Sequence, residues 1–188
     1  LDTGLLYRAV ALSMIRAGDN LKDQEKAANH AASLDYKSMD SPRLRSSDVG
    51  VASSKIAAMK AVRLILLDFQ QKFAKNPPNG RSGTILDGRD IATVVCPEAD
   101  FKIFVTANIE IRAKRRWKQL IQSDEPAIYR RVLEDLWERD TRDSTRQNAP
   151  LRKDSDAITI DTSHLDAEQT FETARKYIAS RDLNRQRS

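Results

Sequence analysis

The stretch Thr84–Ile91 reads TILDGRDI, and the interpretation of the whole chain depends on it. A short apolar run ends abruptly in Asp87-Gly88-Arg89-Asp90. This is typical of a buried parallel strand whose carboxyl end delivers charged side chains to a ligand crevice. An acid, a flexible glycine, an arginine and a second acid together suit an anionic, metal-bound ligand such as a nucleotide. The tetrapeptide alone is more commonly a charged turn, so the rest of the sequence must decide.

Composition limits the classes that need considering. The chain has 188 residues, and 32 Lys and Arg against 27 Asp and Glu give a net charge of +5. The length predicts one domain, and the mild basic surplus favours a polyanionic or phosphorylated partner. A single cysteine excludes an internal disulfide framework and a cysteine-cluster metal site. Neither a membrane-length apolar run nor a signal peptide is recognisable, so we expect a cytoplasmic protein.

The periodicity of apolar residues predicts strands that alternate with helices, and hence a parallel sheet with helices on both faces. A stretch from residue 34 to residue 40 could be a short strand or an extended loop, and the tail after Arg181 is expected to be loose. The predicted strands cover residues 84–86, 101–106 and 157–161. The predicted helices cover about 5–17, 22–34, 46–73 with a break near 59–61, 109–122, 128–145 and 167–179.

The end of the helix predicted over 128–145 carries a charged face. Arg139, Asp143 and Arg146 are spaced i, i+4 and i+7, so they share one side of the helix. A solvated helix with weak ion pairs explains this pattern if the helix is taken alone. The fork-shaped guanidinium group also suits bidentate phosphate binding, so a phosphate site is the second interpretation.

Two further places carry possible chemistry. The basic run Arg112–Lys118 fits a solvated helix face, a nucleic-acid contact, or a lid that brings arginine to a nucleotide. At the start of the chain, Thr3 and Gly4 form a turn in which backbone can approach a ligand, and Arg8 lies one helical turn later.

Together these motifs, in this order and spacing, resemble bacterial cytidylate kinases. The similarity covers LDTG and YR near the start, LDGRDI at 86–91, KIFVTA at 102–107, the arginine-rich segment 139–151 and DAITIDT at 156–162. It implies an α/β fold of the P-loop nucleoside-monophosphate-kinase type with a mobile lid. The implied regions are a core (1–34, 74–111 and 150–188), a CMP-binding region (35–73) and a lid (112–149).

The resemblance also implies an activity and a set of roles. Members of the family transfer the γ-phosphoryl group of ATP to CMP or dCMP with Mg²⁺, by positioning and charge neutralisation. Ser54, Arg63 and Asp90 are expected to read cytosine, and Arg8, Arg89 and Arg146 to hold the phosphate. The remaining expected contacts are Arg139 and Asp143 to the sugar and lid side, Thr3 and Tyr7 nearby, Asp87 to metal-bound water, and Arg115 and Arg116 from the lid. Arg89, Arg139, Arg146 and Asp87 are the expected catalytic set, with no direct metal ligand.

The sequence departs from the family pattern in two places. Only residues 35–44 occupy a stretch where the family often has a longer insert, so the CMP-binding region is expected to be compact. The sequence also lacks the P-loop motif G-x-x-x-x-G-K-[ST], and with it the family's central first strand. We therefore expect the chain to be a truncated form that does not turn over ATP.

Two alternatives stay open. One is another small-molecule kinase of the same fold, against which Ser54, Arg63 and Asp90 argue. The other is a basic nucleic-acid-binding module built on residues 112–118 and 139–153, against which the interspersed acidic residues argue. On the favoured interpretation the partners are CMP or dCMP and ATP, without nucleic acid or membrane, and the protein is a monomer.

Overall fold

A computed structural model describes residues 1–36 and 41–185 of the chain. The chain forms two compact units. The first unit comprises Leu1–Pro97 with Arg139–Arg152, and the second comprises Glu98–Glu138 with Lys153–Ser188. The family resemblance divides the chain differently, into a core, a CMP-binding region and a lid. The two units do not test that division, which stays a prediction.

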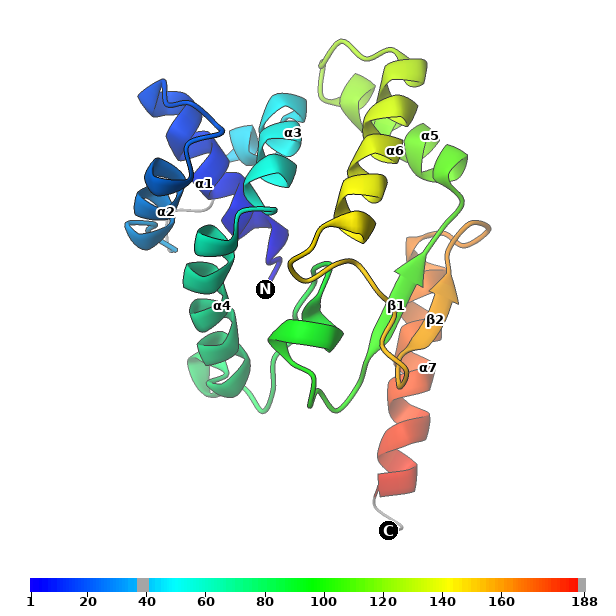
Figure 1. The fold of residues 1–188 in the computed structure, drawn as a ribbon. Helices are drawn as coiled ribbons and strands as arrows, with labels where there is room; N and C mark the ends of the chain where they lie inside the picture. Colours follow the sequence, from blue (N-terminus) through cyan, green and yellow to red (C-terminus); the bar gives the residue numbers. More distant parts are fainter. Residues whose placement is uncertain (37–40, 186–188) are drawn as a thin grey trace. The chain divides into compact units, whose positions relative to one another are not determined.

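The first unit is built mainly from helices, which Figure 1 shows in blue to green. Its long helices were all predicted, including the interruption within the expected helix 46–73. Part of the segment expected to be extended, 37–40, lies outside the described residues. The elements are α1 (Gly4–Ala17), α2 (Gln24–Ala32), the 3₁₀ turns η1 (Pro42–Arg45) and η2 (Pro78–Gly80), α3 (Ser47–Ile56), α4 (Lys60–Lys75) and the π-helical turn η3 (Ile91–Val95).

Local sequence signals set the ends of these helices. Gly18 adopts a left-handed conformation with φ of 70° and caps α1 through its N–H, as a C-terminal glycine commonly does. The Asp23 carboxylate accepts a hydrogen bond from the Lys26 N–H and caps α2. Met59 is extended, so the chain leaves the helical conformation between α3 and α4 and then re-enters it.

The apolar core of the first unit lies among α1 to α4. α1 packs against α3 and α2, and α2 packs against α4. Leu6, Val10, Met14, Ile56 and Leu66 are fully buried there. Burying an aliphatic side chain of this size contributes about 1.5–3 kcal/mol, so this core holds the helices that carry the site.

The prediction of a buried strand at residues 84–86 is wrong. Ile85 is 85% exposed, and the segment makes a single parallel bridge, between Asp2 and Asp87. The Asp87 N–H donates to the Leu1 carbonyl and the Thr3 N–H donates to the Asp87 carbonyl, both over 2.9 Å. The Leu1 amino group also donates to the Ile85 carbonyl over 2.6 Å. A strand needs a longer ladder of such bonds, and among the described residues these bonds join the segment only to Leu1–Thr3. The short bridge still places the end of the DGRD motif beside the start of α1.

The second unit contains a parallel pair of strands, β1 (Ile103–Thr106) and β2 (Ile158–Asp161), with Ile103 opposite Ile158. Figure 1 shows them side by side with α7 (Ala167–Arg185), which packs on β2. α5 (Ile109–Gln122) follows β1, and α6 (Tyr129–Thr145) begins in this unit and ends in the first. The described residues thus form a sheet of two strands, smaller than predicted, because the 84–86 segment does not join a ladder.

The end of the chain differs in part from the expectation of a loose tail, and residues 186–188 of that tail lie outside the described residues. α7 continues to Arg185, beyond the position at which the tail was expected to become loose. Phe101 packs edge-on against Tyr177 of this helix, with 6.4 Å between the ring centroids. Over the residues that the structure describes, no helix is both long and apolar enough to cross a membrane.

Candidate functional site: an arginine–carboxylate pocket

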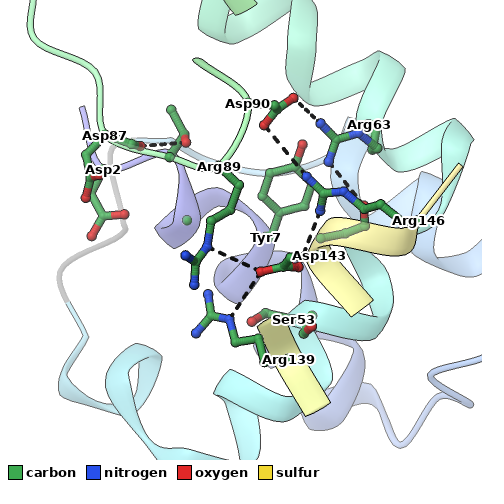
Figure 2. Close-up of a pocket in the computed structure, with 15 residues that line it drawn as sticks. Asp2, Tyr7, Ser53, Arg63, Asp87, Arg89, Asp90, Arg139, Asp143 and Arg146 are labelled. Atoms are coloured by element: carbon green, nitrogen blue, oxygen red, sulfur yellow. Dashed lines mark hydrogen bonds and ion pairs between the residues drawn. The ribbon is translucent and has the colours of Figure 1, made fainter. Parts of the chain in front are cut away.

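The first unit contains a cavity of about 270 Å³, shown in Figure 2. Its walls come from the start of α1, the α3 and α4 helices, the DGRD motif and the end of α6. Most of the residues predicted to form the site line this arginine–carboxylate pocket. They are Thr3, Tyr7, Ser54, Arg63, Asp87, Arg89, Asp90, Arg139, Asp143 and Arg146.

Asp143 gathers three arginines at one end of the pocket (Figure 2). Its Oδ2 lies 3.3 Å from Arg89 Nε and 3.7 Å from Arg139 Nε, and its Oδ1 lies 3.6 Å from Arg146 Nη1. The residue is only 3% exposed. Removing one partner from a buried group of charges strongly destabilises a fold. The arginines are therefore expected to stay close to the Asp143 carboxylate.

Asp90 and Arg63 form a second buried pair. Arg63 Nη2 contacts Asp90 Oδ2, and Arg146 Nη2 lies 4.0 Å from the other carboxylate oxygen. The backbone also orients Arg63, because its Nη1 donates to the Ala57 carbonyl over 3.1 Å. Burial raises the pKa of Asp90 above that of an ordinary aspartate, and the charges of Arg63 and Arg146 oppose this shift.

The two clusters together carry a positive surplus. Four arginines surround two carboxylates, which gives 4 − 2 = +2 for this part of the wall. Burial, and then the charge of Arg89, lower the pKa of Arg139 to about 10, so it stays cationic at neutral pH. A phosphate monoester carries a charge of about −1.5 to −2 at neutral pH. This part of the wall is therefore matched in sign to a monophosphate, whereas Asp2 and Asp87 line another part of the cavity and bring the sum over all its charged lining residues to 4 − 4 = 0.

Some polar atoms of the cluster are buried without a protein hydrogen-bond partner among the described residues. They are Arg139 Nε, Asp143 Oδ2 and Arg146 Nη2, whose ion-pair contacts lie outside hydrogen-bond geometry. Buried polar groups are nearly always paired in folded proteins. A ligand that supplies acceptors would satisfy the two arginine donors, and a ligand hydroxyl or amino donor would satisfy Asp143 Oδ2.

Close packing explains the glycine in the DGRD motif. A Cβ atom on Gly88 would lie 2.3 Å from Thr3 Oγ1 and 2.8 Å from Ile91 Cδ1. Thr3 itself is buried and donates its hydroxyl to the Asp87 carbonyl over 2.7 Å. The backbone of the motif therefore lies directly on the start of α1, which places Asp87 and Arg89 on the pocket wall.

Tyr7 forms part of the wall behind the Arg63–Asp90 pair. It is 9% exposed, and the Arg63 guanidinium carbon lies 5.6 Å from its ring centroid, within the range of a cation–π contact. Burial raises the pKa of Tyr7, so its phenol stays protonated at neutral pH. Tyr7 thus offers an apolar ring face with a neutral polar tip.

Three predicted residues are placed elsewhere. The Arg8 guanidinium donates to the Leu44 carbonyl over 2.8 Å, and Arg8 is not among the residues that line the cavity. In the second unit, the Arg115 guanidinium donates to the carbonyls of Thr162 and Leu165 over 2.5 and 2.9 Å. Arg116 donates to Gln119 Oε1 over 2.9 Å. Their expected roles in phosphate binding and in the lid stay predictions.

Residues for which the sequence predicted no role also contribute to the pocket or contact its walls. Arg142 does not line the cavity, but its Nη1 donates to Oγ of the lining residue Ser54 over 2.7 Å. In the sequence, the position of Arg142 directly before Asp143 could have indicated that it contacts the site. Gly4 and Gly88, which the sequence indicated only as backbone positions of the two motifs, also line the cavity. The lining residues without a role predicted from the sequence are Asp2, Ser53 and Ala57.

A cavity of this size lined by arginines and carboxylates suits a phosphorylated, nucleotide-sized ligand. The chain is a member of the cytidylate kinase family, whose sequence profile matches residues 1–180. Members of this family are nucleoside monophosphate kinases, which are transferases.

Individual relatives give the same result. A cytidylate kinase of Paramagnetospirillum magneticum is 49% identical over 181 residues, which cover 96% of this chain and 85% of the relative. One from Rhodopseudomonas palustris (strain BisA53) is 47% identical over 93% of this chain and 81% of its own length. One from Bradyrhizobium sp. (strain ORS 278) is 45% identical over the full chain and 86% of its own length.

Proposed function

We propose that the arginine–carboxylate pocket binds CMP and dCMP, and that the protein phosphorylates them with ATP as the donor. The observation that carries this proposal is the pairing of a base-reading end with a phosphate-binding end in one cavity. Asp90 and Arg63 form the first, and the arginines around Asp143 form the second.

The base-reading end is complementary to cytosine. A carboxylate only accepts hydrogen bonds, and a guanidinium only donates them. Cytosine presents an amino group beside a ring nitrogen and a carbonyl oxygen, so its amino group suits Asp90 and its acceptors suit Arg63. Uracil presents a carbonyl where cytosine has the amino group, and that carbonyl would face the acceptor oxygens of Asp90. Buried polar mismatches of this kind are strongly rejected.

The phosphate-binding end then acts by position and charge. Arg89 and Arg146 hold the acceptor phosphate, and Arg139 with Asp143 orients the sugar side of the nucleotide. Holding the acceptor oxygen in line with the donor converts a bimolecular encounter into a positioned transfer. Positive charge around the transferred group stabilises the charge that spreads over its oxygens, and no covalent enzyme intermediate is needed.

Magnesium fits the donor set of this chain as a water-mediated partner. Mg²⁺ is usually held by one or two carboxylates together with phosphate oxygens, rather than by a protein cage. Within the described ranges, no cluster of three or more His, Cys, Asp or Glu side chains could hold a metal. Asp2 and Asp87 line the pocket away from Arg63 and Arg146 (Figure 2), and Asp87 would hold the ion through water. When bound with ATP, Mg²⁺ neutralises charge on the phosphates.

The wider features of the proposal follow the family. The fold is of the nucleoside-monophosphate-kinase type, residues 112–149 act as a lid, and Arg115 and Arg116 belong to the ATP side. Arg8 holds the phosphate together with Arg89 and Arg146, and its positive charge contributes to lowering the pKa of Arg139. The protein works as a cytoplasmic monomer without nucleic acid.

Calorimetric titration with CMP, dCMP, UMP and AMP tests the proposal without requiring turnover. We expect CMP and dCMP to bind with one site per chain, and UMP and AMP to bind about fivefold to 150-fold more weakly, because a buried mismatch costs about 1–3 kcal/mol. Equal affinity for AMP and CMP would overturn the base assignment. Strongly salt-dependent binding of random DNA, unaffected by CMP, would favour the nucleic-acid alternative instead.

A further inference from the structure

Ser54 lies between the arginine–carboxylate pocket and a residue behind it. It is 5% exposed, belongs to α3 and lines the cavity. Arg142, near the end of α6, donates from Nη1 to Ser54 Oγ over 2.7 Å and does not itself line the cavity. Arg142 is therefore linked to the wall of the cavity through the serine hydroxyl.

The direction of this hydrogen bond determines what Ser54 can do. A hydroxyl has one donor and two acceptor positions, whereas a guanidinium has donors only and stays charged. Arg142 therefore always occupies an acceptor position of Ser54 Oγ. The hydroxyl hydrogen of Ser54 is left to donate, and this arrangement does not change with pH near neutrality.

The neighbouring serine shows the contrast. Serines in helices commonly donate back to a backbone carbonyl of the preceding turn. Ser53 does so, because its hydroxyl donates to the Gly50 carbonyl over 2.8 Å. Among the described residues Ser54 makes no such bond, and its Oγ accepts a hydrogen bond from Arg142. Of two adjacent serines on the pocket wall, Ser54 is thus the one whose hydrogen is available to a ligand.

We propose that Arg142 is a positioning residue that fixes Ser54 as a hydrogen-bond donor to an acceptor oxygen of the bound nucleotide. The proposal rests on the proposed CMP site. The acceptor is either the carbonyl oxygen of the base or the 2′ oxygen of the sugar, and both present a lone pair. Arg142 thereby adds to nucleotide affinity without touching the nucleotide.

The test is a double-mutant cycle on nucleotide affinity, measured by calorimetry on the full chain. Arg142→Met removes the donors and keeps the stem, Ser54→Ala removes the hydroxyl, and the double variant combines them. Each single change is expected to weaken CMP binding about threefold to tenfold, the effect of one hydrogen bond. The double variant should bind no more weakly than Ser54→Ala alone, because both changes remove the same interaction.

Two further variants separate positioning from a structural role. Arg142→Lys retains a cationic donor and should recover most of the lost affinity. Arg130→Met makes the same substitution in the same helix at a side chain that is 87% exposed and paired with Glu134, so CMP affinity should be unchanged. Thermal unfolding of each variant shows whether an affinity change reflects a loss of folding.

The nucleotide used identifies the acceptor. If Ser54 donates to the 2′ oxygen, Arg142→Met weakens CMP binding and leaves dCMP binding unchanged. If Ser54 donates to the base carbonyl, both nucleotides are weakened by the same factor. Additive effects of the two mutations, or unchanged affinity in Arg142→Met, would overturn the positioning role while leaving the proposed function intact. Failure of the unmutated chain to bind CMP would overturn both.

Discussion

The two units both contain clustered arginines, and they use them differently. In the first unit, Arg63, Arg139 and Arg146 are buried or half-buried around two carboxylates, and some of their polar atoms lack protein hydrogen bonds. In the second unit, Arg115 is exposed at the surface and donates to backbone carbonyls. The number of arginines therefore does not identify a site. Burial beside carboxylates, with donor atoms left for a ligand, identifies it.

The strongest way to break this comparison is Arg146→Ala. Arg146 contacts both Asp90 and Asp143, so its removal leaves two buried carboxylates with fewer cationic partners. Breaking a buried pair costs about 3–5 kcal/mol of folding stability, so we expect a lower unfolding midpoint. Losing a charged hydrogen-bond donor to the phosphate costs about 1.5–3 kcal/mol of binding, so CMP affinity should also fall by about tenfold to a hundredfold. Calorimetry measures the affinity, and thermal unfolding measures the accompanying loss of stability. CMP affinity within twofold of the unmutated chain would contradict the site assignment.

The next effect concerns how the DGRD motif is held. Gly88→Ala would place a Cβ atom against Thr3 and Ile91, so the backbone that carries Arg89 must shift. Overpacking of this kind costs about 1–3 kcal/mol. We expect a lower midpoint of thermal unfolding together with weaker CMP binding. Gly83→Ala is the matched control, since a Cβ there meets nothing within 4 Å, and it should leave CMP binding unchanged.

In the second unit, Arg115→Ala should reduce stability without affecting CMP affinity. The side chain loses its bonds to Thr162 and Leu165, and each net hydrogen bond contributes about 0.5–1.5 kcal/mol before exposure reduces it. A small decrease in the unfolding midpoint, seen by circular dichroism, is the expected result. Lys118→Ala on the same helix serves as the control and should be nearly neutral. A loss of CMP affinity in Arg115→Ala would show that the contrast between the two units is wrong.

The smallest expected effect is a pH dependence that originates at Asp90. Burial raises its pKa, so it becomes protonated at a higher pH than an ordinary aspartate. CMP binding requires the carboxylate as an acceptor. Affinity should therefore fall as the pH decreases through the raised pKa, starting at a higher pH than for an ordinary aspartate. Titrations at several pH values measure this. The Asp90→Asn variant should bind CMP more weakly, and its affinity should not show this decrease at low pH.

Most of the helices, and most of the residues that line the pocket, could be predicted because their signals are local. Gly18 ends α1, and the spacing of Arg139, Asp143 and Arg146 places them on one helix face. The strand at residues 84–86 could not be judged in this way, because a strand exists only through its partners. A short apolar run before DGRD has the composition of a strand, but Ile85 is exposed and one bridge is all that forms.

The individual roles of the arginines also depend on contacts between distant segments. Arg8 and Arg115 have the same chemistry as Arg89, and sequence alone assigned all three to nucleotide binding. The structure places backbone carbonyls beside Arg8 and Arg115, and a buried carboxylate beside Arg89. Arg142 was not assigned a role, because its link to Ser54 joins residues that are far apart in the chain.

The sequence by itself determined the family, the helices, and the residue types that a phosphate and a cytosine require, since these depend on composition and spacing. Tertiary structure decided which of those residues face one cavity, which of two adjacent serines has a hydrogen to donate, and why residue 88 is glycine. The physical reason is that charge pairing, hydrogen-bond direction and close packing act between atoms in contact. In this chain those contacts join the start of α1, the DGRD motif and the end of α6, which are distant in sequence.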